Sequence, residues 1–146
     1  MYREMYSQAP IDVPMYIGKD AVRTDDKRAM SPPHDHQHIL GHFNYGHASH
    51  VNSAIDAALA ARPSWSALPW NERAAVFLKA ADLIAGPYRA KINAATMLAQ
   101  SKNIFQAEID AACALIDFLR FNAYFLQEIQ DVQPDSQDGR WNRMEY

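Results

Sequence analysis

The sequence predicts a mostly α-helical protein that begins with a small β-hairpin and a strand. Two patterns lead to this prediction. Apolar residues recur every three or four positions through most of residues 49–131, which is typical of amphipathic helices. Before residue 49, short apolar runs are separated by glycine and proline, which is typical of strands and turns. With 146 residues, 49% hydrophobic and 21% charged, the chain has the composition of a globular domain.

We divide the chain into four segments by composition and patterning. Residues 1–13 are expected to form a loose lead-in segment, and residues 14–48 a β-hairpin followed by an extended strand. Residues 49–131 have the helical periodicity and predict a four-helix region. Residues 132–146 are expected to form a polar connection that enters a truncated strand.

Local signals predict where the helices begin and end. The first helix is expected to start at the N-cap residue Ser49 and to stop at Pro63. Gly86 closes the second helix, and Pro87 opens the third. The fourth helix, over residues 104–130, is the longest. Its expected apolar face advances in steps of three and four residues: Phe105, Ile109, Ala112, Ile116, Leu119, Ala123 and Leu126.

The charge and cysteine content narrow the class of protein. A formal net charge of −3 gives no electrostatic reason to expect a nucleic-acid or membrane partner. The single cysteine excludes an internal disulfide and fits a reducing compartment. No apolar run approaches the roughly 20 residues of a membrane span. The N-terminal residues show no targeting signal, so we expect a cytoplasmic protein.

All six histidines fall within a short window, from His34 to His50. If this stretch is a strand, His34, His36, His38 and His42 share one face, and three such imidazoles could hold a zinc ion. The alternative is a polar strand edge with solvent-facing imidazoles. Because the chain offers no second cluster of ligands, we favour the alternative and assign no metal site.

The long helix contains the remaining candidates for chemistry. Cys113 has no histidine or lysine near it in sequence, so we interpret it as a buried, inert core cysteine. Asp110 and Asp117 fall near one face around Ala114 and could line a cleft. The alternative is a solvated face on which Asp117 pairs with Arg120. The scattered glycines form no phosphate-binding loop, so no catalytic or cofactor-binding residue is assigned.

Four stretches together resemble a known family. They are "SPPHDHQHILGHF", "AIDAALAARPSW", "ERAAVFLKAADLIAGPYRAKINAATMLAQSKN" and "QAEIDAACALIDFLRFN". They are similar to the N-terminal region of the 1-pyrroline-5-carboxylate dehydrogenases, a branch of the aldehyde dehydrogenase superfamily, from about Pro14 to Tyr146. The resemblance implies the N-terminal part of an α/β aldehyde dehydrogenase fold. It also implies that the complete enzyme uses NAD to oxidise L-glutamate γ-semialdehyde to glutamate in proline catabolism.

The same resemblance implies where the functional parts lie. The catalytic cysteine, the base glutamate and the NAD-binding loop would follow Tyr146, so this chain alone would not be catalytic. Asp110 would lie near the substrate tunnel and Asp117 at its margin, with Ala114 at a position where the family often has a glutamate. The expected partners are the remainder of the dehydrogenase chain and, in the complete protein, further copies of it. The expected compartment is the bacterial cytoplasm, or the mitochondrial matrix in a eukaryote.

A second hypothesis is a stand-alone helical module, derived from such an enzyme, that acts in protein interaction. The feature that bears on both hypotheses is the apolar surface of the long helix. If Phe118, Phe121 and Phe125 are uncovered, they form a patch that needs a further domain or a partner.

Overall fold

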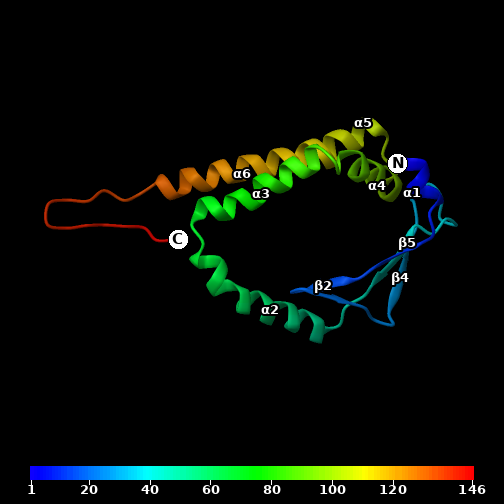
Figure 1. Cartoon of the computed structure of the whole chain (residues 1–146), viewed down its shortest axis with the longest axis horizontal. Coiled ribbons are helices and arrows are strands. Elements are labelled where there is room, and N and C mark those ends of the chain that lie inside the picture. Colours follow the sequence, from blue (N-terminus) through cyan, green and yellow to red (C-terminus); the bar gives the residue numbers. More distant parts are fainter.

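The computed structural model describes the whole chain and shows an open, ring-like arrangement of two arms (Figure 1). One arm contains α3 (Trp70–Ala85) and α6 (Ala114–Asp131), which lie side by side. The other arm contains α2 (Ala48–Ala67) and the hairpin of β2 (Met15–Ile17) and β3 (Asp20–Val22). The predicted class, mostly helical with a few short strands, is confirmed.

A three-stranded sheet joins the two arms near the N-terminus. Its order is β1 (Ile11–Val13), β5 (Gly41–Asn44), β4 (Lys27–Met30), with β1 parallel and β4 antiparallel to the central strand. Ile11 pairs with Gly41, and a Cβ atom at Gly41 would lie only 2.5 Å from the carbonyl oxygen of Ile11. Only glycine therefore allows the first strand to approach the central strand so closely.

The loose lead-in predicted for residues 1–13 is wrong. These residues form α1 (Tyr2–Ser7), which packs on α4, and the strand β1. The strand is only three residues long, and its pairing with β5 defines it. The predicted hairpin at residues 15–23 is confirmed, with Gly18 at a φ of 61° in the turn.

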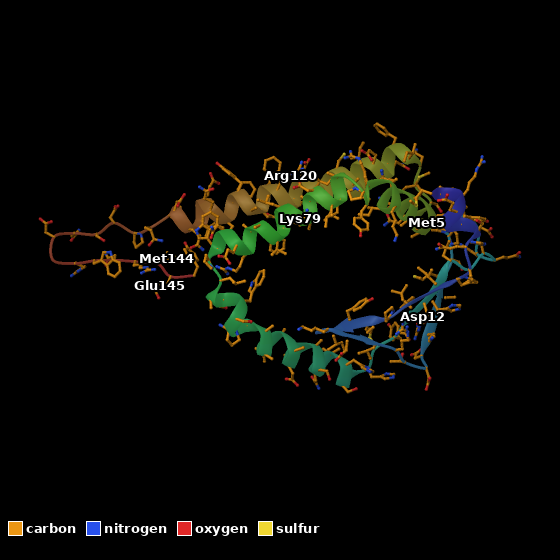
Figure 2. All side chains as sticks on the ribbon, in the orientation of Figure 1. Met5, Asp12, Lys79, Arg120, Met144 and Glu145 are labelled. Carbon is orange, nitrogen blue, oxygen red and sulfur yellow. The ribbon has the colours of Figure 1, made fainter.

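A charge cluster around Asp12, which Figure 2 labels, ties this sheet to the hairpin. The carboxylate of Asp12 accepts hydrogen bonds from Arg23 Nε at 2.7 Å and from Lys27 Nζ at 2.9 Å. These two cations, Lys27 first, lower the pKa of Asp12 to about 2. The buried Asn44 completes the cluster, donating to Asp12 and to the carbonyl of Val13.

The four predicted helices are present, although three of the predicted bounds are wrong. The first helix, α2, is capped by His47 rather than Ser49, and the His50 ring accepts a hydrogen bond from the backbone N–H of His47 at 3.0 Å. It also continues through Pro63 to Ala67. A proline inside a helix removes one backbone hydrogen bond, so α2 is locally destabilised at Pro63. The sequence pattern predicted a helix end at this position instead.

After α3, the third helix is α4 (Arg89–Gln100), which begins two residues after the predicted start at Pro87, because residues 86–88 form a turn. The fourth is one continuous rod with three parts: α5 (Ile104–Ala107), the π-helix η1 (Glu108–Cys113) and α6. The π-helical part lies where the sequence pattern predicted an uninterrupted α-helix. It determines which face of α6 meets α3.

The hydrophobic core is small and lies between α3 and the rod. Only 11 of 146 residues are buried, and the core cluster is Ala81, Ala112 and Ile116. The accessible surface is 10716 Å², whereas a compact 16.5 kDa protein exposes about 7,500 Å². The excess is about 3,200 Å², and it includes large apolar side chains on α2, α3 and α6.

Residues 132–146 leave the helical arm as an extended excursion, red in Figure 1. Its only regular feature is an isolated bridge between Gln137 and Arg140. The strand predicted at the end of residues 132–146 is absent, since no partner strand lies beside this segment. None of the helices in the structure combines the length and the apolar character needed to cross a bilayer.

Candidate functional site

The candidate site is the middle of the helical rod, where η1 joins α6. At this junction the backbone N–H of Ala114 donates to the carbonyl of Ile109, five residues earlier, as in a π-helix. The same spacing explains why Ala107 and Ala112, five positions apart, are both fully buried. Phe105, which the uninterrupted α-helical pattern placed on the buried face, is 72% exposed. Ile109, from the same predicted face, is also exposed.

A polar cluster holds the start of η1 against α4. The Glu108 carboxylate accepts hydrogen bonds from Arg89 Nε at 2.8 Å and from Arg89 Nη2, both at Oε1. Its other oxygen accepts from Asn93 Nδ2, and the Asn93 side chain is buried. The Arg89 guanidinium, followed by Asn93, lowers the pKa of Glu108, so this carboxylate is ionised at neutral pH.

Sequence reasoning missed this cluster because its partners are distant in the chain. Glu108 is 19 residues from Arg89 and 15 from Asn93. One signal was available: Arg89 and Asn93 are four positions apart and therefore share a face of one helix. That signal points to a common partner but does not identify it.

Cys113 belongs to the same cluster. Its sulfur lies 3.4 Å from Arg89 Nη2 and 3.7 Å from Glu108 Oε1. The thiol is half-buried, so the prediction of a fully buried cysteine in an apolar core is wrong. The reason is that the π-helix turns this side chain toward α4 and its arginine.

The three predicted tunnel residues lie on one helical rod and differ in their exposure and ion pairs. Asp110 is exposed and pairs with Lys102 Nζ at 2.7 Å. Ala114 is half-buried, and Asp117 is exposed without an ion-pair partner. The predicted pairing of Asp117 with Arg120 is wrong, because Arg120 reaches across to Asp82 of α3, 3.1 Å away.

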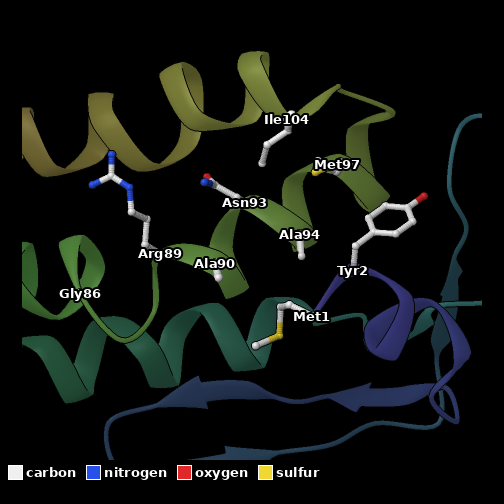
Figure 3. A pocket seen from close by; sticks show the side chains of 9 residues that line it. All are labelled: Met1, Tyr2, Gly86, Arg89, Ala90, Asn93, Ala94, Met97 and Ile104. Carbon is white, nitrogen blue, oxygen red and sulfur yellow. The ribbon is translucent and has the colours of Figure 1, made fainter.

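A cavity of about 450 Å³ lies beside the polar cluster (Figure 3). Arg89 and Asn93 form its polar side, and Met1, Tyr2 and Ile104 belong to its mostly apolar wall. The Oδ1 atom of Asn93 is buried and has no hydrogen-bond partner. Since the Arg89 guanidinium is paired with Glu108 and the amino group of Met1 with Glu4, the lining supplies no free cation for a phosphate.

The histidines do not share a strand face, as the zinc hypothesis required. Residues 33–38 form turns and a bend, and only His42 lies on a strand. His34 Nδ1 is 2.6 Å from Ser101 Oγ, whereas the ring of His38 stacks on Tyr6 with centroids 4.0 Å apart. Asp35, whose backbone and side chain close these turns, is the local reason. No group of three or more metal-ligating side chains gathers anywhere in the chain.

Comparisons of the sequence with known proteins all find aldehyde dehydrogenases. The sequence model of the aldehyde dehydrogenase family matches residues 22–146. A delta-1-pyrroline-5-carboxylate dehydrogenase from Agaricus bisporus is 49% identical over 98% of the chain and 26% of its own length. A probable delta-1-pyrroline-5-carboxylate dehydrogenase from Schizosaccharomyces pombe is 43% identical over 99% of the chain and 27% of its own length.

Solved structures agree with these relatives. The Delta-pyrroline-5-carboxylate dehydrogenase from Mycobacterium tuberculosis matches with a TM-score of 0.94 and 47% identity. The match covers 99% of this chain and 27% of that one. The same bacterial enzyme has also been solved bound with NAD. The chain therefore spans about a quarter of the length of the relatives that it matches.

Proposed function

The chain belongs to the aldehyde dehydrogenase family, and we propose that it is the N-terminal part of an NAD-dependent 1-pyrroline-5-carboxylate dehydrogenase. That enzyme oxidises L-glutamate γ-semialdehyde to glutamate in proline catabolism. The observation that supports this most strongly is 47% identity, with a TM-score of 0.94, to a dehydrogenase of that name over 99% of the chain.

In this proposal the chain supplies scaffolding and one wall of the substrate tunnel. The excess surface of about 3,200 Å² is several times the roughly 800 Å² that one partner buries in a standard protein interface. The side chains of Phe118, Phe121 and Phe125 are 66%, 57% and 47% exposed. The remainder of the dehydrogenase chain would cover these faces, and the complete protein would assemble as a homo-oligomer.

NAD, when bound to the complete enzyme, accepts the hydride of the aldehyde. The nucleophile in the proposed reaction is a cysteine thiolate outside these residues. Cys113 is unsuited to that role, because it lies within a continuous helical rod and its thiol contacts Glu108. No glycine-rich stretch of this chain matches a phosphate-binding motif, so we assign none of these residues to the cofactor.

We assign Asp110, Ala114 and Asp117 to the tunnel wall. Ala114 carries no charge, so at this position the tunnel wall offers no carboxylate to the ammonium group of the substrate. In the complete enzyme, Ala114→Glu should lower KM for the semialdehyde, because a carboxylate attracts the ammonium. Gln127→Glu adds the same charge at an exposed position further along α6 and should leave KM unchanged. If the two substitutions changed KM equally, residue 114 would not belong to the tunnel wall.

The test of the proposed function starts from the native polypeptide. Its intact mass should be several times 16.5 kDa, and it should form NADH from pyrroline-5-carboxylate and NAD. A long polypeptide that oxidises other aldehydes but not this substrate would overturn the proposed specificity. A native species of 16.5 kDa would instead support the interaction module, whose partner would cover the exposed phenylalanines.

We propose the cytoplasm of a bacterium, or the mitochondrial matrix of a eukaryote, as the compartment. Relatives from Danio rerio and Mus musculus are named as mitochondrial delta-1-pyrroline-5-carboxylate dehydrogenases. The single free thiol fits either reducing compartment. Fractionation of source cells, with the polypeptide detected by mass spectrometry, tests the assignment. Recovery with secreted proteins would contradict it.

A further inference from the structure

The π-helix gives the rod one more residue in its middle than an α-helix would need. An extra residue in a turn rotates everything that follows by about 100°, one α-helical step. The buried face of the observed arrangement runs Ala107, Ala112, Ile116 and then the half-buried Leu119. The first interval is five residues, and the following intervals are four and three.

The same sequence contains a second apolar stripe, one position earlier. Without the π-helix, the face that continues from Ala107 would contain Ala111, Leu115 and Phe118. Leu115 and Phe118 are now 42% and 66% exposed. Helix α6 therefore has two apolar faces, and apolar patterning alone does not decide which of them packs on α3.

Contacts on the observed side select one arrangement. Ala81 of α3 is fully buried in a cluster with Ala112 and Ile116, and Leu119 packs against this cluster. In the other arrangement the larger side chain of Phe118 would have to fit where Leu119 now packs. At the first residue of η1, Glu108 receives hydrogen bonds from both Arg89 and Asn93 of α4. These bonds anchor the start of the π-helix to a neighbouring helix.

We propose that Glu108, held by Arg89 and Asn93, is a positioning residue that sets the rotation of α6 and thereby places Ala114 and Asp117 on the substrate side. The inference rests on the proposed function for the role of the substrate side. Its structural part, that Glu108 maintains the π-helix, stands independently. Glu108 itself does not touch the substrate.

The test uses substitutions and one compensating deletion in the complete polypeptide that contains this sequence. Glu108→Ala removes the anchor, so the π-helix relaxes to an α-helix and α6 rotates. KM for the semialdehyde should rise about tenfold, with kcat changed much less, because the lost contacts bind substrate and transition state alike. Deleting Ala111 in the same variant removes the extra residue, returns all later residues to their original rotation and should restore KM. Asp82→Asn breaks the interhelical pair with Arg120 outside η1 and should leave KM unchanged.

Each outcome either supports or overturns the positioning role of Glu108. An unchanged KM in Glu108→Ala, or a raised KM that the deletion of Ala111 fails to restore, would overturn the positioning role. If Glu108→Ala does not fold, Glu108→Gln, which keeps a carbonyl acceptor, should show a smaller rise in KM that the deletion also corrects. If the unmodified enzyme does not oxidise the semialdehyde, the proposed function has failed. A crystal structure of Glu108→Ala then tests the rotation alone, and an intact π-helix there would overturn it.

Discussion

Helices α2 and α6 have nearly the same length, 20 and 18 residues, and opposite surroundings. Helix α6 packs along α3 and buries Ile116, which is 4% exposed. Helix α2 buries no residue, and Ile55 on its apolar stripe is 51% exposed. The comparison teaches that an apolar stripe marks a face that requires cover but does not supply the neighbour that covers it.

The difference predicts that the same substitution has unequal effects in the two helices. Ile116→Ala should lower the free energy of unfolding of this chain by about 2–5 kcal/mol, because it removes a packed side chain and leaves a cavity. Ile55→Ala, the matched control, should cost less than about 0.5 kcal/mol, since its side chain is largely solvated. Urea unfolding followed by circular dichroism measures both. Equal losses would show that α2 is covered in solution.

Pro63 offers a second way to examine α2. Replacing it with alanine restores a backbone donor inside the helix, and in a helix interior proline is less favourable than alanine by about 3 kcal/mol. Because α2 has little tertiary support, the gain should appear as greater helix content of this chain in far-ultraviolet circular dichroism. The control is Ala58→Leu on the same helix, which should change the signal little. A Pro63→Ala signal equal to the parent's would indicate that contacts outside the helix hold α2.

Acid should weaken the arm that contains α2 through the Asp12 cluster. The folded-state pKa of Asp12, about 2, lies below its ordinary value of 3.8. Its contribution to stability is therefore fully present above about pH 4 and is lost as the pH falls toward 2. Stability measured from pH 5 to pH 2 should fall less steeply in Asp12→Asn than in the parent. Asp56→Asn, at an unpaired carboxylate on α2, should keep the parent's slope, and a flattening there would contradict the assignment.

The smallest effect is expected at the surface of the α3–α6 contact. Arg120→Ala removes the exposed pair with Asp82 and should lower the free energy of unfolding by less than about 1 kcal/mol. Raising the salt concentration should reduce even this loss. Lys79→Ala, at an exposed cation on α3 without an ion pair, is the control. A loss comparable with that of Ile116→Ala would mean that charge, rather than apolar packing, holds the two helices together.

Much of the fold could be predicted from local patterns. The hairpin around Gly18 and the four-helix region followed from turn residues and from the period of the apolar positions. The strand β1 escaped prediction because three residues contain no periodic signal, and its partner β5 begins 30 positions further along the chain. The strand predicted for the histidine segment was wrong for a related reason. The turns closed by Asp35 prevent the extended backbone that the partly alternating polar and apolar residues indicated.

The candidate site was only partly predictable. Asp110 and Asp117 were identified from their shared helix face, and the resemblance placed them and Ala114 at the tunnel, but their environments depend on partners elsewhere. Lys102 pairs with Asp110, whereas Arg120 turns away from Asp117 toward α3. A helical period of three to four residues cannot reveal the five-residue π spacing, which depends on contacts with α4.

By itself, the sequence determined the helices, the hairpin and the family of this protein, because each depends on nearby residues or on residue identity along the whole chain. The tertiary structure alone decided which apolar face of α6 is buried, and it brought Glu108 to Arg89 and Asn93. The physical reason is that both apolar faces satisfy the same helical period. Only the packing of Leu119 against the Ala81 cluster and the anchored π-helix distinguish them.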